Sequence, residues 1–116
     1  MTMLAGTTGV TESEFENLAG ATLAALESAF ESGAPDVDVQ SKGAGLLEVE
    51  FDNGSKMIIN RHAAAREIWV AAVSGGFHFR HDGRAWRDTR DGTELFAAIS
   101  RLASQQAGTM IALSAG

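Results

Sequence analysis

The sequence contains no cysteine. This excludes disulfides, thiolate metal ligands and cysteine nucleophiles. No apolar run approaches the roughly 20 residues of a membrane span, and no charged segment precedes an apolar core at the N-terminus, so neither a membrane helix nor a signal peptide is expected. We therefore expect a cytoplasmic protein without a membrane partner. A chain of 116 residues is the size of one domain.

Basic residues are missing from the first third of the chain. Residues 1–41 contain seven acidic side chains and no Lys or Arg, a net charge of −7. The remainder contains the other eight acids and all nine bases, a net charge of +1. Nucleic-acid binding requires a basic face, so this distribution argues against a nucleic-acid partner. It favours a cation or a basic protein surface.

The middle of the chain has the patterns of an antiparallel sheet. Residues 46–51 alternate between apolar and acidic, which is the period of a half-buried strand. Asn53-Gly54 follows and is a strong hairpin signal. The short connections imply a meander of sequential strands. The strands are predicted at 36–39, 46–51, 56–60, 67–73 and 77–81, with a short additional one near 84–87.

Two amphipathic helices are predicted to flank these strands. Thr11 and Glu14 have the spacing of a capping box, and apolar residues at helical spacing predict a helix of about twenty residues that Gly33 ends. A second helix is predicted to begin with Asp91 as its cap and Glu94 at the third position, and to end at Gly108. The apolar tail 110–113 is expected to lie between the helices and close the core.

The predicted class is α+β: a two-layer α/β sandwich with two terminal helices packed on one face of a five- to six-stranded antiparallel sheet. The other face of the sheet is then left to solvent or to a partner. Residues 1–10 are expected to be a flexible extension, residues 11–108 a single domain and residues 109–116 a C-terminal tail.

Carboxylates gather along the first helix and the strand after it. At 100° per residue, Glu16, Glu27 and Glu31 fall on one flank of the helix. Asp36 and Asp38 then share one face of the predicted strand at 36–39. The two groups could form one continuous acidic surface that binds a cation or a basic protein. They could also be a solvated face that keeps a small protein soluble, which is the more common role of such a pattern, and the pattern alone leaves both interpretations open.

No arrangement of catalytic residues is apparent. His78 and His81 are three positions apart in a predicted strand, so they point to opposite faces and do not make a paired ligand site. No Ser/His/Asp arrangement or phosphate-binding loop is present. We therefore predict no catalytic residues. Trp69 is either a core residue or an exposed residue of the open sheet face, near Asn60 and Arg61, with the composition of an interaction hot spot.

The chain resembles the frataxin family, in its bacterial CyaY type, from about Thr11 to Gly108. The resemblance is carried by residues spread over most of the domain. They are Ser13-Glu14-Phe15, Phe51-Asp52-Asn53-Gly54-Ser55-Lys56, Ile58-Ile59-Asn60-Arg61, Ile68-Trp69-Val70-Ala71, Gly75-Gly76-Phe77-His78-Phe79 and the segment 86–90. The family fold is similar to the sandwich predicted above.

The resemblance implies an iron-binding accessory protein of iron–sulfur cluster assembly, which acts as an iron donor or as a regulator. It implies that the protein is not primarily an enzyme and that it has no organic cofactor. Weakly bound iron, Fe²⁺ or Fe³⁺, would lie on the first helix and the adjacent edge strand. The same ridge would dock on a cysteine desulfurase, and the sheet face with Asn60, Arg61 and Trp69 would contact the scaffold protein. The implied iron ligands are Glu27, Glu31, Asp36 and Asp38, with Glu12, Glu14 and Glu16 as further candidates.

The sequence departs from the family pattern around both implied surfaces. Gly20, Ser28 and Ser32 stand where acids are common, which bears on metal stoichiometry. His62 stands where Gln is frequent, and Glu67 precedes the Ile-Trp pair in place of a common Gln.

Three other functions remain open: a ferroxidase, a metal-independent acidic protein-binding module resembling a secretion chaperone, and a purely structural domain. The chaperone class usually works as a dimer, whereas we expect a monomer that could form oligomers with iron.

Overall fold

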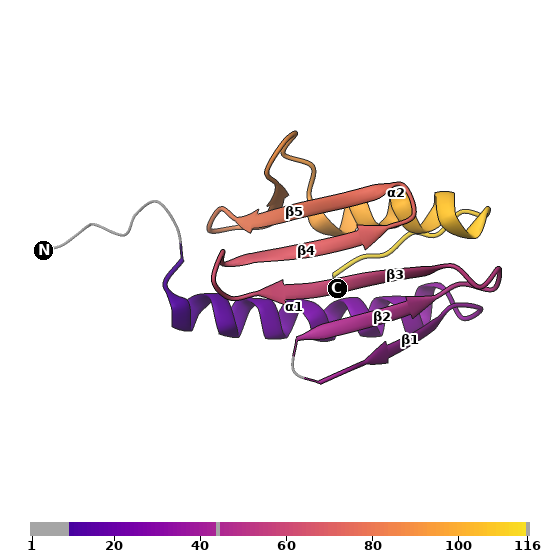
Figure 1. Ribbon diagram of the computed structural model, residues 1–116, viewed down its shortest axis with the longest axis horizontal. Helices are drawn as coiled ribbons and strands as arrows, with labels where there is room; N and C mark the ends of the chain where they lie inside the picture. Colours follow the sequence, from indigo (N-terminus) through magenta and orange to yellow (C-terminus); the bar gives the residue numbers. More distant parts are fainter. Residues whose placement is uncertain (1–9, 44, 116) are drawn as a thin grey trace, which may run out of the picture.

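The computed structural model describes residues 10–43 and 45–115, and it has two layers. Figure 1 shows one sheet with both helices on the same face. The element order is helix, six strands, helix, which confirms the predicted fold class. The elements are α1 (Glu12–Gly33), β1 (Asp38–Ser41), β2 (Leu46–Glu50), β3 (Lys56–His62), β4 (Glu67–Ala72), β5 (Gly75–His81), β6 (Trp86–Asp88) and α2 (Leu95–Ala107).

The strands follow one another across the sheet in the order of the sequence, β1 to β6, and every neighbouring pair is antiparallel. The predicted meander is therefore confirmed. The prediction for the first strand was wrong by two residues. Asp36 lies in a turn after Pro35, closed by a hydrogen bond from the Val37 amide to the Ala34 carbonyl (2.9 Å), and pairing with β2 begins only at Asp38.

The start of α1 is the predicted capping box. The Glu14 amide donates to the Thr11 hydroxyl (3.1 Å), and the Thr11 amide donates to the Glu14 carboxylate (2.8 Å). These bonds satisfy amides at the first turn that have no partner within the helix. Val10, which precedes the cap, packs against the core. The rest of the predicted N-terminal extension, residues 1–9, lies outside the described residues.

The start of α2 differs from the prediction. Asp91 is not its cap: its carboxylate accepts from the Thr93 amide (2.9 Å) within a turn, where Gly92 has a positive φ of 79°. The cap is Glu94, whose carboxylate accepts from the amides of Phe96 (2.8 Å) and Ala97 (3.1 Å). The turn around Gly92 delays helical geometry until Leu95.

The C-terminal tail lies between the helices, as predicted. The Leu113 amide donates to the Ser100 hydroxyl of α2 (2.9 Å), and the Ile111 amide donates to that of Ser104 (2.8 Å). Both tail side chains are buried, and a Leu113 methyl lies near Gly33 at the end of α1. Two serines one helical turn apart thus bind alternate residues of an extended segment.

The core lies between the helices and one face of the sheet. Phe15 and Phe30 from α1, Ile59 and Phe79 from the sheet, and Ile99 from α2 are fully buried. Trp86 packs edge-on against Phe15 at 5.9 Å, and its indole N–H donates to Thr22 of α1. Among the described residues, no helix is long and apolar enough to cross a membrane.

Candidate functional site

The acidic residues of the first turns of α1 have local partners. Glu14 belongs to the capping box, and the Thr11 amide and then its hydroxyl lower the pKa of the Glu14 carboxyl. Glu16 forms an ion pair with Arg61 of β3, with 2.7 Å between oxygen and nitrogen. Glu12 is exposed at the helix start. Of these three candidates, two therefore already hold a structural contact.

Farther along α1, Glu27 and Glu31 are one helical turn apart, and Glu31 is exposed. No ion pair within residues 10–43 and 45–115 includes either carboxylate. Two neighbouring negative charges without a basic partner repel each other. This turn is therefore an uncompensated negative site, as the sequence predicted.

Four carboxylates border a shallow depression at the β1 edge of the sheet. Asp36 and Asp38 were predicted candidates, and they line the depression with Glu50 and Asp52. Sequence reasoning missed the latter two, because their proximity comes from strand register: Glu50 lies directly opposite Asp38. No group of three His, Asp or Glu side chains in the described part of the chain is arranged to hold a metal ion. The carboxylates form an open acidic surface without a preformed cage.

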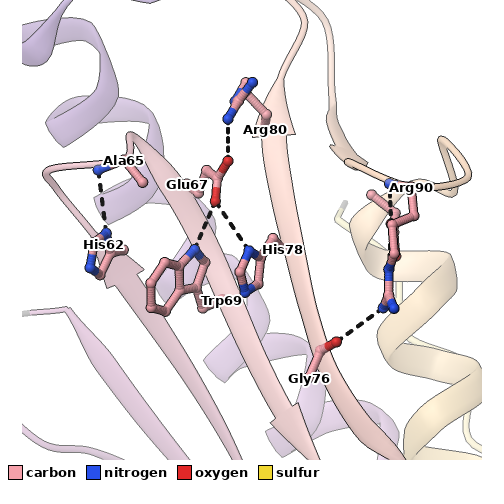
Figure 2. A network of polar contacts seen from close by, with 9 residues as sticks. His62, Ala65, Glu67, Trp69, Gly76, His78, Arg80 and Arg90 are labelled. Carbon is pink, nitrogen blue, oxygen red and sulfur yellow. Dashed lines mark hydrogen bonds and ion pairs between the residues drawn. The ribbon is translucent and has the colours of Figure 1, made fainter.

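The open face of the sheet has a stacked group of rings at its centre. Trp69 of β4 lies between two imidazoles: its ring centroid is 3.8 Å from that of His62 and 4.5 Å from that of His78, with interplanar angles of 9° and 11°. Asn60 lies directly opposite Trp69 on β3. The side chain of Trp69 is half-buried, which lies between the two alternatives that the sequence left open. Figure 2 shows the indole between the two histidines.

Glu67 connects the stack to neighbouring charges (Figure 2). It is 5% exposed, accepts a hydrogen bond from Trp69 Nε1 (2.8 Å), lies 3.5 Å from His78 Nδ1 and forms an ion pair with Arg80. Burial disfavours its charge. The hydrogen bonds from Trp69 and Arg80, with the charges of Arg80 and His78, outweigh burial and lower the pKa of the Glu67 carboxyl.

The expected position of Arg61 on the open face beside Asn60 and Trp69 was wrong. Arg61 lies opposite the fully buried Ile68, so it points to the helix side of the sheet, where it pairs with Glu16. Neighbouring residues of a strand point to opposite faces, which separates Arg61 from Asn60. His78 and His81 are likewise on opposite faces, as predicted: His81 contacts the buried Trp86.

A model of the frataxin-like domain matches residues 8–109. The chain belongs to the frataxin family. Among curated relatives, this frataxin-family chain is 54% identical over 102 residues to the iron–sulfur cluster assembly protein CyaY of Dechloromonas aromatica, covering 88% of the chain and 97% of the relative. It is 51% identical to the protein of the same name from Cupriavidus pinatubonensis, covering 90% and 96%. These relatives place it in the bacterial CyaY type.

Solved structures agree with this assignment. The frataxin from Psychromonas ingrahamii is 30% identical and superimposes with a TM-score of 0.82, covering 90% of the chain and 99% of that protein. The trimeric frataxin of Saccharomyces cerevisiae, solved in complex with ferrous iron, has a TM-score of 0.60 at 19% identity, covering 94% and 92%, and shares the fold. The resemblance stated from the sequence is confirmed over most of the domain.

Proposed function

We propose that this frataxin-family chain is an iron-binding accessory protein of iron–sulfur cluster assembly. It acts as an iron donor or regulator of the cysteine desulfurase–scaffold complex, without turnover of its own. The proposal is supported by the curated relatives, which are named iron–sulfur cluster assembly proteins, at up to 54% identity over nearly their whole length. The observation that carries it is the open acidic surface along α1 and the β1 edge.

In this proposal, iron is a cargo held by oxygen ligands. Carboxylates suit hard, labile cations, and an exposed surface without a cage gives modest affinity and low selectivity. The turn with Glu27 and Glu31 and the depression at Asp36 and Asp38 are its strongest parts. Within the described residues, none of these carboxylates forms an ion pair with a basic side chain. Glu14 and Glu16 contribute less, because their oxygens already have local partners.

The two proposed docking surfaces differ in chemistry. The acidic surface of α1 and β1 binds a basic patch of the desulfurase, and such charged contacts mainly raise the association rate. The open sheet face around Asn60 and Trp69 contacts the scaffold protein. Arg61 supports the fold from the other side of the sheet, through its ion pair with Glu16.

An anaerobic Fe(II) titration of ¹⁵N-labelled protein, followed by amide NMR spectra, tests the iron site. Selective broadening of residues 12–38 and of the neighbouring 50–52, with the sheet centre unchanged, is expected. The Glu27→Gln/Glu31→Gln double variant should lose broadening in its part of α1, and the exposed Asp91→Asn variant, near β6 at the far edge of the sheet, is the matched control. Uniform broadening in all three proteins would refute the assigned surface.

A further inference from the structure

Both faces of the Trp69 ring are occupied. The His62 and His78 rings lie nearly parallel to the indole, with interplanar angles of 9° and 11°, and their centroids are 3.8 and 4.5 Å away. A partner therefore has no access to a flat indole face. What reaches the surface from this half-buried side chain is the rim of the ring, in a row with two imidazole rims across β3, β4 and β5 (Figure 2).

The indole is also fixed at its nitrogen. Glu67, two residues earlier on the same strand face, is almost completely buried and accepts the Trp69 N–H at 2.8 Å. The same oxygen lies 3.5 Å from His78 Nδ1, and the other oxygen binds Arg80. His62 is held separately, because its Nδ1 accepts from the Ala65 amide at 3.3 Å. One carboxylate thus fixes the tryptophan and one of its two covering rings.

We propose that Glu67 is a positioning residue of the scaffold-docking surface, which holds Trp69 edge-on between the two histidines before the partner arrives. The inference rests on the proposed function and specifies its mode of recognition. The rims of aromatic rings are electropositive, and the cationic Arg80 is adjacent. The surface therefore fits an apolar slot of the scaffold protein bordered by carbonyl or carboxylate oxygens. Fixing the ring beforehand removes an ordering cost from binding.

Variants of Glu67 test whether this residue positions the Trp69 ring as a hydrogen-bond acceptor or only fills space. Glu67→Gln retains an oxygen that can accept the Trp69 N–H, whereas Glu67→Met has a similar length and no comparable acceptor. Glu48→Met is the matched control: Glu48 is a partly buried carboxylate of the same sheet face, on β2, and pairs with Lys42 and Lys56. Circular dichroism and thermal melting establish that each variant is folded at the assay temperature.

Binding of each protein to the purified scaffold protein is measured by isothermal titration calorimetry. The Glu67→Met protein should bind the scaffold about tenfold more weakly than the wild type, because Trp69 is then no longer held in place. The affinities of Glu67→Gln and Glu48→Met should stay within about threefold of the wild-type affinity. In the free proteins, NMR should show nuclear Overhauser contacts from Trp69 to His62 and His78 in the wild type and Glu67→Gln. These contacts should be weakened in Glu67→Met.

Wild-type affinity of a folded Glu67→Met protein would overturn the inference, and so would unchanged ring contacts in that variant. Equal weakening by Glu48→Met would also overturn it, because the effect would then belong to any carboxylate of the face. A wild-type protein that does not bind the scaffold refutes the proposed docking instead. In that case the ring contacts of the free variants still decide whether Glu67 positions Trp69.

Discussion

Replacing Leu113 by alanine should destabilise the domain although the residue lies close to the C-terminus. Its side chain is 7% exposed and lies beside Gly33, so the tail seals the gap between the helices. Leu→Ala changes in a core cost about 2–5 kcal/mol. A terminal segment can relax toward the helices, so we expect the lower part, about 2–3 kcal/mol, and a decrease in Tm of about 10–15 °C.

Urea and thermal unfolding followed by circular dichroism measure this loss. The matched control is Met110→Ala, at a position three residues away that is 85% exposed, where the change should stay below about 0.5 kcal/mol. A Leu113→Ala protein as stable as this control would refute the reasoning, because the tail would then contribute no burial.

The serine hydroxyl beneath the tail provides a second test of the same contact. Ser100→Ala removes the acceptor of the Leu113 amide, which costs about 1–3 kcal/mol if that amide stays buried. Either variant alone should loosen the tail. The decrease in the free energy of unfolding of the double variant should therefore be smaller than the sum of the two single decreases by at least about 0.5 kcal/mol. Strictly additive losses would mean that the serine and the leucine act independently.

Three further outcomes are expected. The amides of Ala85 and then Arg84 lower the pKa of Asp82 to about 2, so its contribution to stability is complete above the ordinary pKa of about 4 and is lost as the pH falls toward 2. Asp82→Asn should remove that part of the acid dependence of the urea midpoint. Trp69→Ala should leave the protein folded and cost about 1–2 kcal/mol in urea unfolding, since the ring is half-buried, and a loss of about 3–5 would indicate a core residue. Thr11→Ala should cost about 1 kcal/mol by the same measurement, and an unchanged value would contradict the role of its cap.

Features that depend on short-range patterns could be predicted from the sequence. The capping box at Thr11 and Glu14, the hairpin at Asn53-Gly54 and the stop at Gly108 each involve residues a few positions apart. Alternation along single strands likewise placed His78 and His81 on opposite faces. Because the connections between consecutive strands are short, few sheet topologies other than the meander were compatible with the sequence.

Features that depend on strand register or on competing turns could not be predicted from the sequence. The proximity of Glu50 to Asp38 follows from one alignment of β1 with β2. A shift of that alignment by one residue would place the two carboxylates on opposite faces of the sheet. The stack of His62, Trp69 and His78 needs three strands in register, although the alternation that put Glu67 on the side of Trp69 was a usable signal. The predicted start of α2 was wrong because Gly92 forms a turn, although the spacing of Asp91 and Glu94 is also compatible with the first turn of a helix.

The short strands at the two edges of the sheet bear on aggregation. An unpaired edge strand is a template for pairing with another chain, and proteins reduce this risk with short, charged or covered edges. β1 is four residues long and begins with Asp38, and β6 is three residues long. The outer side of β6 is partly covered by a bridge from Arg87 to Glu94. One broad face of the sheet can therefore stay uncovered by helices while the short edges disfavour extension of the sheet into fibres.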